Sequence, residues 1–188
     1  MPKSLREMEA EVKAYQQEKG WTEYRSVPVS LALLHEEVSE VGRAWREWGL
    51  GDATTGVTAD GPDHSRQAKP QGVGSELADV VIRIMDTSGR YGLGVPGLVP
   101  HHRGAFALSE EFMVNVNTLH DLISRVSLAW ESNHSADTTA DDLAAGLATV
   151  LAFTFQLARR SGINIQYEYE RKMAYNHTRD YRHGNRRC

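Results

Sequence analysis

A tandem repeat constrains the fold of this 188-residue chain more than any other feature of its sequence. Residues 34–45 (LHEEVSEVGRAW) align without gaps with residues 119–130 (LHDLISRVSLAW), and Leu, His, Ser, Val, Ala and Trp recur at the same places. The segments that follow also match, residues 77–80 with 147–150 and residues 90–93 with 160–163. The offset between the copies falls from 85 to 70 residues, so we expect the first copy to contain a longer connection.

The apolar residues of the first copy have helical periodicity. Their 3-4-3-4-3 spacing predicts one buried helix face, made of Leu31, Leu34, Val38, Val41, Trp45 and Trp48. Ser30 is the expected N-cap of this helix and Gly49 its expected end. Ser4 and Glu7 have the spacing of a capping box, while Gly92 and Gly162 are expected helix stops.

Further helices are predicted at about residues 5–19, 75–91, 110–132, 140–161 and 165–180, with Thr139 capping the fifth of the six. No strand pattern is convincing, so the sequence predicts an all-α fold. Two similar helical hairpins, within residues 28–92 and 110–165, would form a four-helix core with pseudo-twofold symmetry, flanked by N- and C-terminal helices. Residues 1–188 then form one domain.

Residues 49–74 are rich in Gly, Asp, Thr, Ser and Pro, which predicts an inserted surface loop that could contain a small hairpin. His35 and Trp45 recur as His120 and Trp130, and we interpret these recurring residues as packing residues.

The composition narrows the possible classes of function. A formal charge of −4 with 24 % charged residues does not indicate a nucleic-acid-binding surface. The single cysteine, Cys188, allows no internal disulfide and fits a reducing compartment. No apolar run reaches the roughly 18 residues of a membrane span, and the N-terminus lacks a hydrophobic signal core. We therefore expect a cytoplasmic protein that binds neither nucleic acid nor membranes.

Two pairs of acids are spaced for metal binding. Glu37 and Glu40 are three residues apart on one predicted helix, and Glu76 and Asp79 repeat this spacing on the next. Acids at that spacing are neighbours on a helix surface, where their like charges repel. A divalent cation would reverse this effect, because hard ions such as Mg²⁺ prefer oxygen ligands. We therefore predict that the two helices hold hard metal ions.

The second copy of the repeat lacks these acids. Their counterparts are Leu122, Arg125, Gly146 and Thr149. A fold that required the acids for packing would have them in both copies, so a function explains their presence in the first. We interpret residues 28–92 as the active repeat and residues 110–165 as a degenerate repeat.

The acidic pattern Glu-Glu-x-x-Glu followed by Glu-x-x-Asp resembles that of the all-α nucleoside triphosphate pyrophosphohydrolases, such as MazG-like proteins, dimeric dUTPases and phosphoribosyl-ATP pyrophosphohydrolases. The matching residues are Glu36, Glu37, Glu40, Glu76 and Asp79. A tandem copy without the acids is most similar to the dimeric dUTPase branch. A Lys-x-x-x-Asn-x-x-Arg segment, formed by Lys172, Asn176 and Arg179, resembles the same branch, and the run through Gly184 is similar to tails of phage-encoded MazG-like enzymes.

The resemblance implies Mg²⁺-dependent hydrolysis of a nucleoside triphosphate to the monophosphate and pyrophosphate. A deoxynucleotide is the favoured substrate, and Mn²⁺ is an expected substitute for Mg²⁺. It implies that Glu37, Glu40, Glu76 and Asp79 bind the metal. Glu37 or Glu40 would also act as the general base. Lys172, Asn176 and Arg179 are implied to bind the substrate phosphates. The resemblance also suggests a homodimer.

Two alternatives stay open at the level of sequence. One is a dimeric dUTPase specific for dUTP, and the other is a nucleotide-binding sensor or scaffold with weak catalysis. The sequence does not identify the base. Amide and aromatic groups for a base pocket are available in and after the first helix, at Gln16, Gln17, Trp21 and Tyr24.

Overall fold

The computed structural model describes residues 2–50, 69–99, 106–132 and 136–180, with the backbone alone for residues 136–139. These residues form seven helices and no strand, which confirms the predicted all-α fold. The helices are α1 (Leu5–Glu18), α2 (Val27–Trp48), α3 (Val73–Tyr91), α4 (Val95–Leu98), α5 (Phe112–Ser132), α6 (Ala136–Arg160) and α7 (Ile165–Thr178). The hairpin considered for the 49–74 loop falls largely on residues 51–68, outside the described residues.

Several helix ends lie where the sequence predicts them. Ser4 caps α1: its Oγ accepts a hydrogen bond from the Glu7 amide at 3.3 Å, and Glu7 Oε2 accepts one from the Ser4 amide at 2.6 Å. Gly92 and Gly162 follow α3 and α6 with φ angles of +66° and +71°, a conformation that favours glycine at a helix end.

Other helix ends differ from the prediction. α2 begins at Val27 after the N-cap Ser26, and Ser30 lies inside the helix. Pro28 belongs to the first helical turn, where an amide N–H has no partner within the helix and can be dispensed with. α6 begins at Ala136, so Thr139 also lies inside a helix. The short helix α4 lies between the helices predicted at residues 75–91 and 110–132 and corresponds to no predicted helix.

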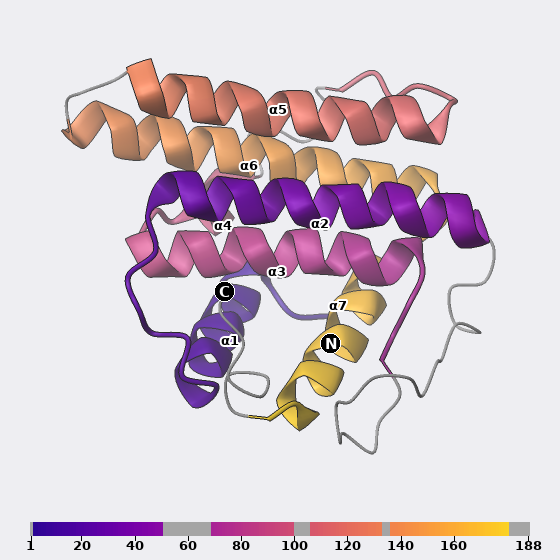
Figure 1. Cartoon of the computed structure of the whole chain (residues 1–188), viewed down its shortest axis with the longest axis horizontal. Helices are drawn as coiled ribbons and strands as arrows, with labels where there is room; N and C mark the ends of the chain where they lie inside the picture. Colours follow the sequence, from indigo (N-terminus) through magenta and orange to yellow (C-terminus); the bar gives the residue numbers. More distant parts are fainter. Residues whose placement is uncertain (1, 51–68, 100–105, 133–135, 181–188) are drawn as a thin grey trace.

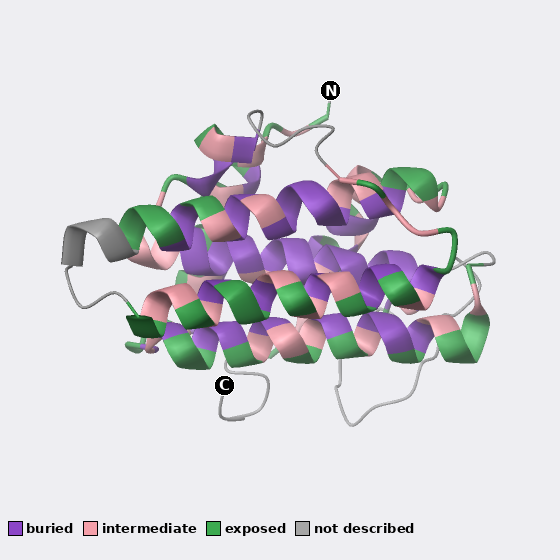
Figure 2. Ribbon diagram, turned by 90° about the horizontal axis from the view of Figure 1, so that it is seen from above, coloured by how far each residue is buried: buried purple, intermediate pink, exposed green. Residues whose placement is uncertain are grey.

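The helices pack as two hairpins with additional helices on one side (Figure 1). α2 pairs with α3 and α5 pairs with α6, while α2 also contacts α5 and α3 contacts α6. α1 and α7 pack against α3 on the side away from the second hairpin. α3 is therefore the central helix, and it is apolar and buried along most of its length (Figure 2).

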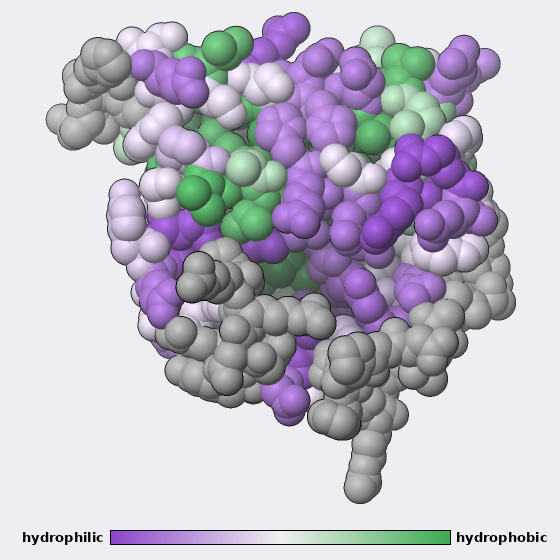
Figure 3. Space-filling model, in the orientation of Figure 1, coloured by the Kyte–Doolittle hydropathy of each residue, from purple (hydrophilic) through white to green (hydrophobic). Residues whose placement is uncertain are grey.

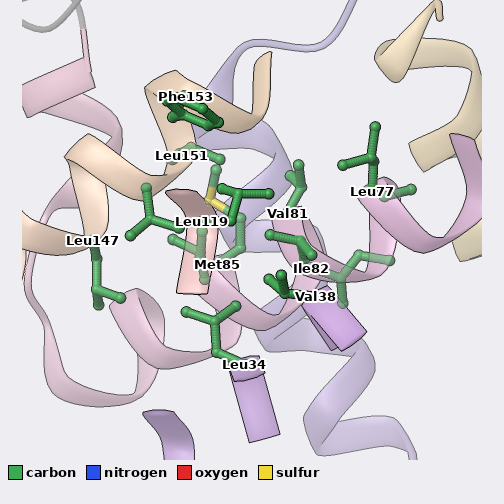
Figure 4. Close-up of a cluster of buried hydrophobic side chains, with 14 of the residues drawn as sticks. Leu34, Val38, Leu77, Val81, Ile82, Met85, Leu119, Leu147, Leu151 and Phe153 are labelled. Atoms are coloured by element: carbon green, nitrogen blue, oxygen red, sulfur yellow. The ribbon is translucent and has the colours of Figure 1, made fainter. Parts of the chain in front are cut away.

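The core between the hairpins is built from aliphatic side chains of four helices (Figure 4). Fully buried members include Val38, Leu77, Leu119, Leu147 and Leu151. The recurring histidines meet at this junction: His35 Nδ1 lies 2.9 Å from His120 Nδ1, and their rings stack with centroids 5.2 Å apart. Equivalent residues come together in this way near a twofold axis, so the contact supports a packing role for both histidines.

One helical segment of the described chain is long and apolar enough to cross a membrane by length and composition. It comprises Ala140–Arg160 of α6, with a mean hydropathy of 1.2 in its most apolar window. More than half of that window, 56 %, is buried inside the fold. The core helix of a soluble protein has the same properties, so this segment is no strong indication of membrane insertion.

Candidate functional site

A cavity of about 300 Å³ lies among α1, α2, α3 and α7 and brings most of the predicted site residues together. Six of the seven predicted residues line the cavity. They are Glu37 and Glu40 from α2, Asp79 from α3, Lys172 and Asn176 from α7, and Arg179 directly after α7. Glu76 is not part of the lining but lies beneath it, in contact with Lys172. The face shown in Figure 3 carries mainly hydrophilic side chains around a hollow below its centre.

The α2 wall carries Glu37 and Glu40 on one helical strip. Glu37 is largely buried and its Oε1 accepts a hydrogen bond from Arg83 Nη2 at 2.6 Å. Burial raises the pKa of Glu37, and the nearby Asp79 raises it further, while Arg83 opposes both effects. Glu40 is more accessible and pairs with Arg43 at 3.2 Å. Glu37 and Glu40 therefore each have a cation of the protein as a partner.

α3 carries Glu76 in its first turn and Asp79 in the next, and of these two acids only Asp79 lines the cavity. The first-turn position is favourable for an anion because backbone N–H groups point toward it. Glu76 is nevertheless only 4 % exposed. Burial raises its pKa to about 7, with Lys172 acting against this shift and Asp79 adding to it. Among the described residues, no hydrogen-bond donor reaches Glu76 Oε2.

Lys172 extends from α7 to both α3 acids. Its Nζ lies 2.5 Å from Asp79 Oδ2 and 3.7 Å from Glu76 Oε2, and it donates a hydrogen bond to Ser75 Oγ at 3.0 Å. Burial alone would lower the pKa of Lys172, but the two carboxylates raise it above its usual value. The lysine predicted to bind phosphate is thus an ion-pair partner of the acids in this conformation.

The chemistry of the α2 and α3 acids fits a divalent metal, although their present arrangement does not. Four carboxylates from two adjacent helices are typical hard-ion ligands, and the buried Glu76 Oε2 lacks a partner in the described structure. However, no three acidic, histidine or cysteine side chains within the described ranges are grouped closely enough to hold an ion. Metal binding would require the carboxylates to leave their lysine and arginine partners.

A buried ion-pair network lies where the turn between α1 and α2 meets α3. From the sequence, Asp86 is as good a candidate for a cap or an ion-pair partner as for a metal ligand, but its partners are not predicted. Asp86 on α3 accepts from Arg25 at 2.8 Å and lies 3.1 Å from Arg90. Arg90 also donates to the carbonyl oxygens of Trp21 and Glu23. These contacts fix the turn between α1 and α2 on α3. The seven-residue spacing of Asp79 and Asp86 was the one available signal, and it does not specify a partner.

The same turn and α1 supply the less charged part of the lining. It contains two of the four residues considered for a base pocket, Gln16 and Trp21. Tyr24 is 86 % exposed and Gln17 is also exposed, and neither lines the cavity. Additional apolar and aromatic contacts come from Tyr15, Leu33, Ile82 and Tyr175.

In the second hairpin, the position equivalent to Glu76 is too closely packed for a side chain. Gly146 is the counterpart of Glu76 in the repeat, and a Cβ atom there would lie 2.5 Å from Val126 Cγ2. α5 and α6 thus approach too closely for a side chain at this position. The absence of an acid at this position of the second hairpin therefore has a packing explanation.

Comparison with known proteins identifies no relative: no family model, curated protein or solved structure matches this chain significantly.

Proposed function

We propose that this protein hydrolyses a nucleoside triphosphate, with deoxynucleotides favoured, to the monophosphate and pyrophosphate in a Mg²⁺-dependent reaction. The observation that carries the proposal is the convergence on one cavity of carboxylates from α2 and α3 with Lys172, Asn176 and Arg179 from the far end of the chain. Acids for a metal and donors for phosphates are the two sets of groups that this reaction requires.

The charge of the cavity supports a requirement for added cations. Five acidic and five basic side chains line it: Glu36, Glu37, Glu40, Asp79, Asp86, Arg25, Lys69, Arg83, Lys172 and Arg179. This lining has no net formal charge, so by itself it gives little attraction for a triphosphate with several negative charges. Mg²⁺ held by the α2 and α3 acids would supply that positive charge and polarise the phosphoryl group under attack.

The protein's own groups then have distinct roles. Arg179 and Asn176, which line the cavity, would hold phosphate oxygens, and the guanidinium suits contact with two oxygens at once. A water molecule attacks the α-phosphorus, the bond to the bridging α–β oxygen breaks, and pyrophosphate leaves. Glu40 or Glu37 accepts the proton of that water. Glu40 is the more accessible of the two and the better candidate, since Glu37 is tied to Arg83.

A nucleotide-binding sensor with little catalysis is the second candidate. Three cavity acids are already neutralised by cations of the protein, in the Arg83–Glu37, Arg43–Glu40 and Lys172–Asp79 pairs. A site with its charges satisfied in this way could bind a ligand without completing the metal arrangement needed for hydrolysis. A dUTP-specific enzyme is a narrower form of the main proposal, and substrate preference decides between them.

The test is release of monophosphate and pyrophosphate from a panel of nucleoside and deoxynucleoside triphosphates, with Mg²⁺ or with chelator. We expect turnover with Mg²⁺ alone, and its loss in the Glu40→Gln variant. Glu47→Gln is the matched control, because Glu47 is an exposed acid of the same helix and lies outside the cavity. Nucleotide binding without turnover of any substrate would favour the sensor, and absence of both would contradict each candidate.

A further inference from the structure

Lys172 is a buried cation between two buried or half-buried acids. Its side chain is 3 % exposed, and its Nζ contacts Asp79 Oδ2 at 2.5 Å, Ser75 Oγ at 3.0 Å and Glu76 Oε2 at 3.7 Å. The ammonium therefore lies between the carboxylates of α3 on the side that faces the cavity. Because α7 supplies this contact, the group also joins the C-terminal helix to the centre of the fold.

One ammonium does not fully neutralise this pair of carboxylates. Lys172 carries a single positive charge, whereas Glu76 and Asp79 together can carry two negative charges. The closer contact is with Asp79, and no described donor forms a hydrogen bond with Glu76 Oε2, which is shielded from solvent. Buried charge is costly when it is incompletely paired, so the cluster favours an additional or a stronger cation.

We propose that Lys172 is a resident counter-ion, whose ammonium holds the place between Glu76 and Asp79 until a divalent cation binds and then moves into the cavity. This inference rests on the proposed metal site and concerns how the empty site is kept intact. It treats Lys172 as a positioning residue that keeps the two carboxylates together in the metal-free protein and competes with the metal for them.

The geometry requires the ammonium to move if Asp79 becomes a metal ligand. Mg²⁺ lies about 2.1 Å from its ligand oxygens, so an ion on Asp79 and an ammonium at its present position would repel each other at short range. Lys172 also lines the cavity with Asn176 and Arg179. A change of its flexible side-chain rotamer can turn the ammonium from the acids toward the space where phosphates would bind, without movement of α7.

Amine labelling of the whole, unmodified protein tests this movement directly. The protein is treated with an acetylating reagent in chelator or in saturating Mn²⁺ without nucleotide, and acetylation of each lysine is followed by peptide mass spectrometry. We expect Lys172 to react slowly in chelator and several-fold faster with Mn²⁺. Lys13, which is exposed on α1 away from the cavity, should react equally in both conditions. Slow acetylation of Lys172 in protein with bound Mn²⁺ would overturn the proposal.

The Lys172→Met variant tests the competition. Removal of the ammonium should tighten Mn²⁺ binding, measured by calorimetry, by about tenfold or more, since a competing charge is lost. It should also lower the melting temperature in chelator, with recovery on addition of Mn²⁺. Lys13→Met is the control, because Lys13 is exposed on α1 and lies outside the cavity; its Mn²⁺ affinity should change far less. Equal or weaker Mn²⁺ binding by Lys172→Met would contradict a counter-ion role.

The outcomes separate this inference from the proposed function. If the unmodified protein binds Mn²⁺ and releases Lys172 but hydrolyses no nucleotide, the counter-ion role stands and the hydrolase proposal fails. If it hydrolyses nucleotides with Mg²⁺ while Lys172 stays protected, the hydrolase proposal stands and the counter-ion role fails. Absence of any divalent-ion binding would overturn both. Should Lys172→Met not fold in chelator, the labelling of the unmodified protein decides.

Discussion

Replacement of Glu76 by glutamine should stabilise the metal-free protein at alkaline pH. Glu76 is 4 % exposed, and its pKa in the folded protein is raised from 4.5 to about 7. The folded state therefore keeps a proton that the unfolded state releases at lower pH. Stability is lost as the pH rises from the unfolded pKa through the folded one, and the loss is complete above about pH 8.

The magnitude follows from the size of the pKa shift. A rise of the pKa from 4.5 to about 7 corresponds to about 3 kcal/mol in the free energy of unfolding, and it already includes the attraction of Lys172. Glu76→Gln preserves the size of the side chain but cannot ionise. We expect the variant to exceed the parent protein by about 3 kcal/mol at pH 9 and by less than about 1 kcal/mol at pH 5.

Urea unfolding in chelator, followed by circular dichroism at pH 5 and pH 9, measures both differences. Glu47→Gln, at an exposed position of α2, should show no pH-dependent difference from the parent. In Mg²⁺ the order should reverse at pH 9, because the parent gains binding energy that the variant has lost. A variant that is less stable than the parent at pH 9 in chelator, or that differs equally at both pH values, would refute this reasoning.

Two further predictions concern the packing of the hairpins. Gly146→Ala should destabilise the protein by about 1–3 kcal/mol despite the better helix propensity of alanine, because its Cβ would meet Val126 Cγ2 at 2.5 Å. Urea unfolding of the Gly146→Ala/Val126→Ala double variant should show that stability is recovered. If stability is not recovered, this clash is excluded as the cause. Burial lowers the pKa of His35 and of His120 below the usual 6.5, so the stability present above pH 6.5 should be lost as the pH falls from there through the lowered folded pKa values. Unfolding at pH 8 and pH 5.5 should show a smaller loss for His120→Gln than for the parent, and an equal loss would contradict the role of this pair.

Local helix geometry explains which parts of the site the sequence could predict. The i, i+3 spacing of Glu37 with Glu40 places both acids on one strip of α2, and both line the cavity. Asp79 also lines it, and the repeat identifies His35 and His120 as equivalent packing residues, which contact each other in the structure. The position of a residue on a helix face depends on residues a few positions away, and the equivalence of two residues depends on the similarity of two segments. Both can be recognised in the sequence.

The interactions of those residues could not be predicted in the same way. The spacing of Asp86 on α3 gives no indication that Arg25, from the turn before α2, is its partner. The sequence predicts the start of α2 about one turn late, at Ser30, whereas the helix begins after Ser26, whose side chain makes no capping hydrogen bond. The partner of a charged residue and the first residue of a helix both depend on which neighbouring segment packs there. Helix propensity alone is compatible with several partners and several starts.

The sequence by itself determined an all-α chain with a helical repeat and two acid pairs spaced along helix faces, since these features follow from local periodicity. The tertiary structure alone decided that α7 crosses α3 so that Lys172 reaches Glu76 and Asp79. Ser75 and Lys172 are 97 residues apart, and no local pattern specifies such a contact. The packing of α7 on α3 sets the distances between charges, and through them the pKa of Glu76 and the partner of each acid.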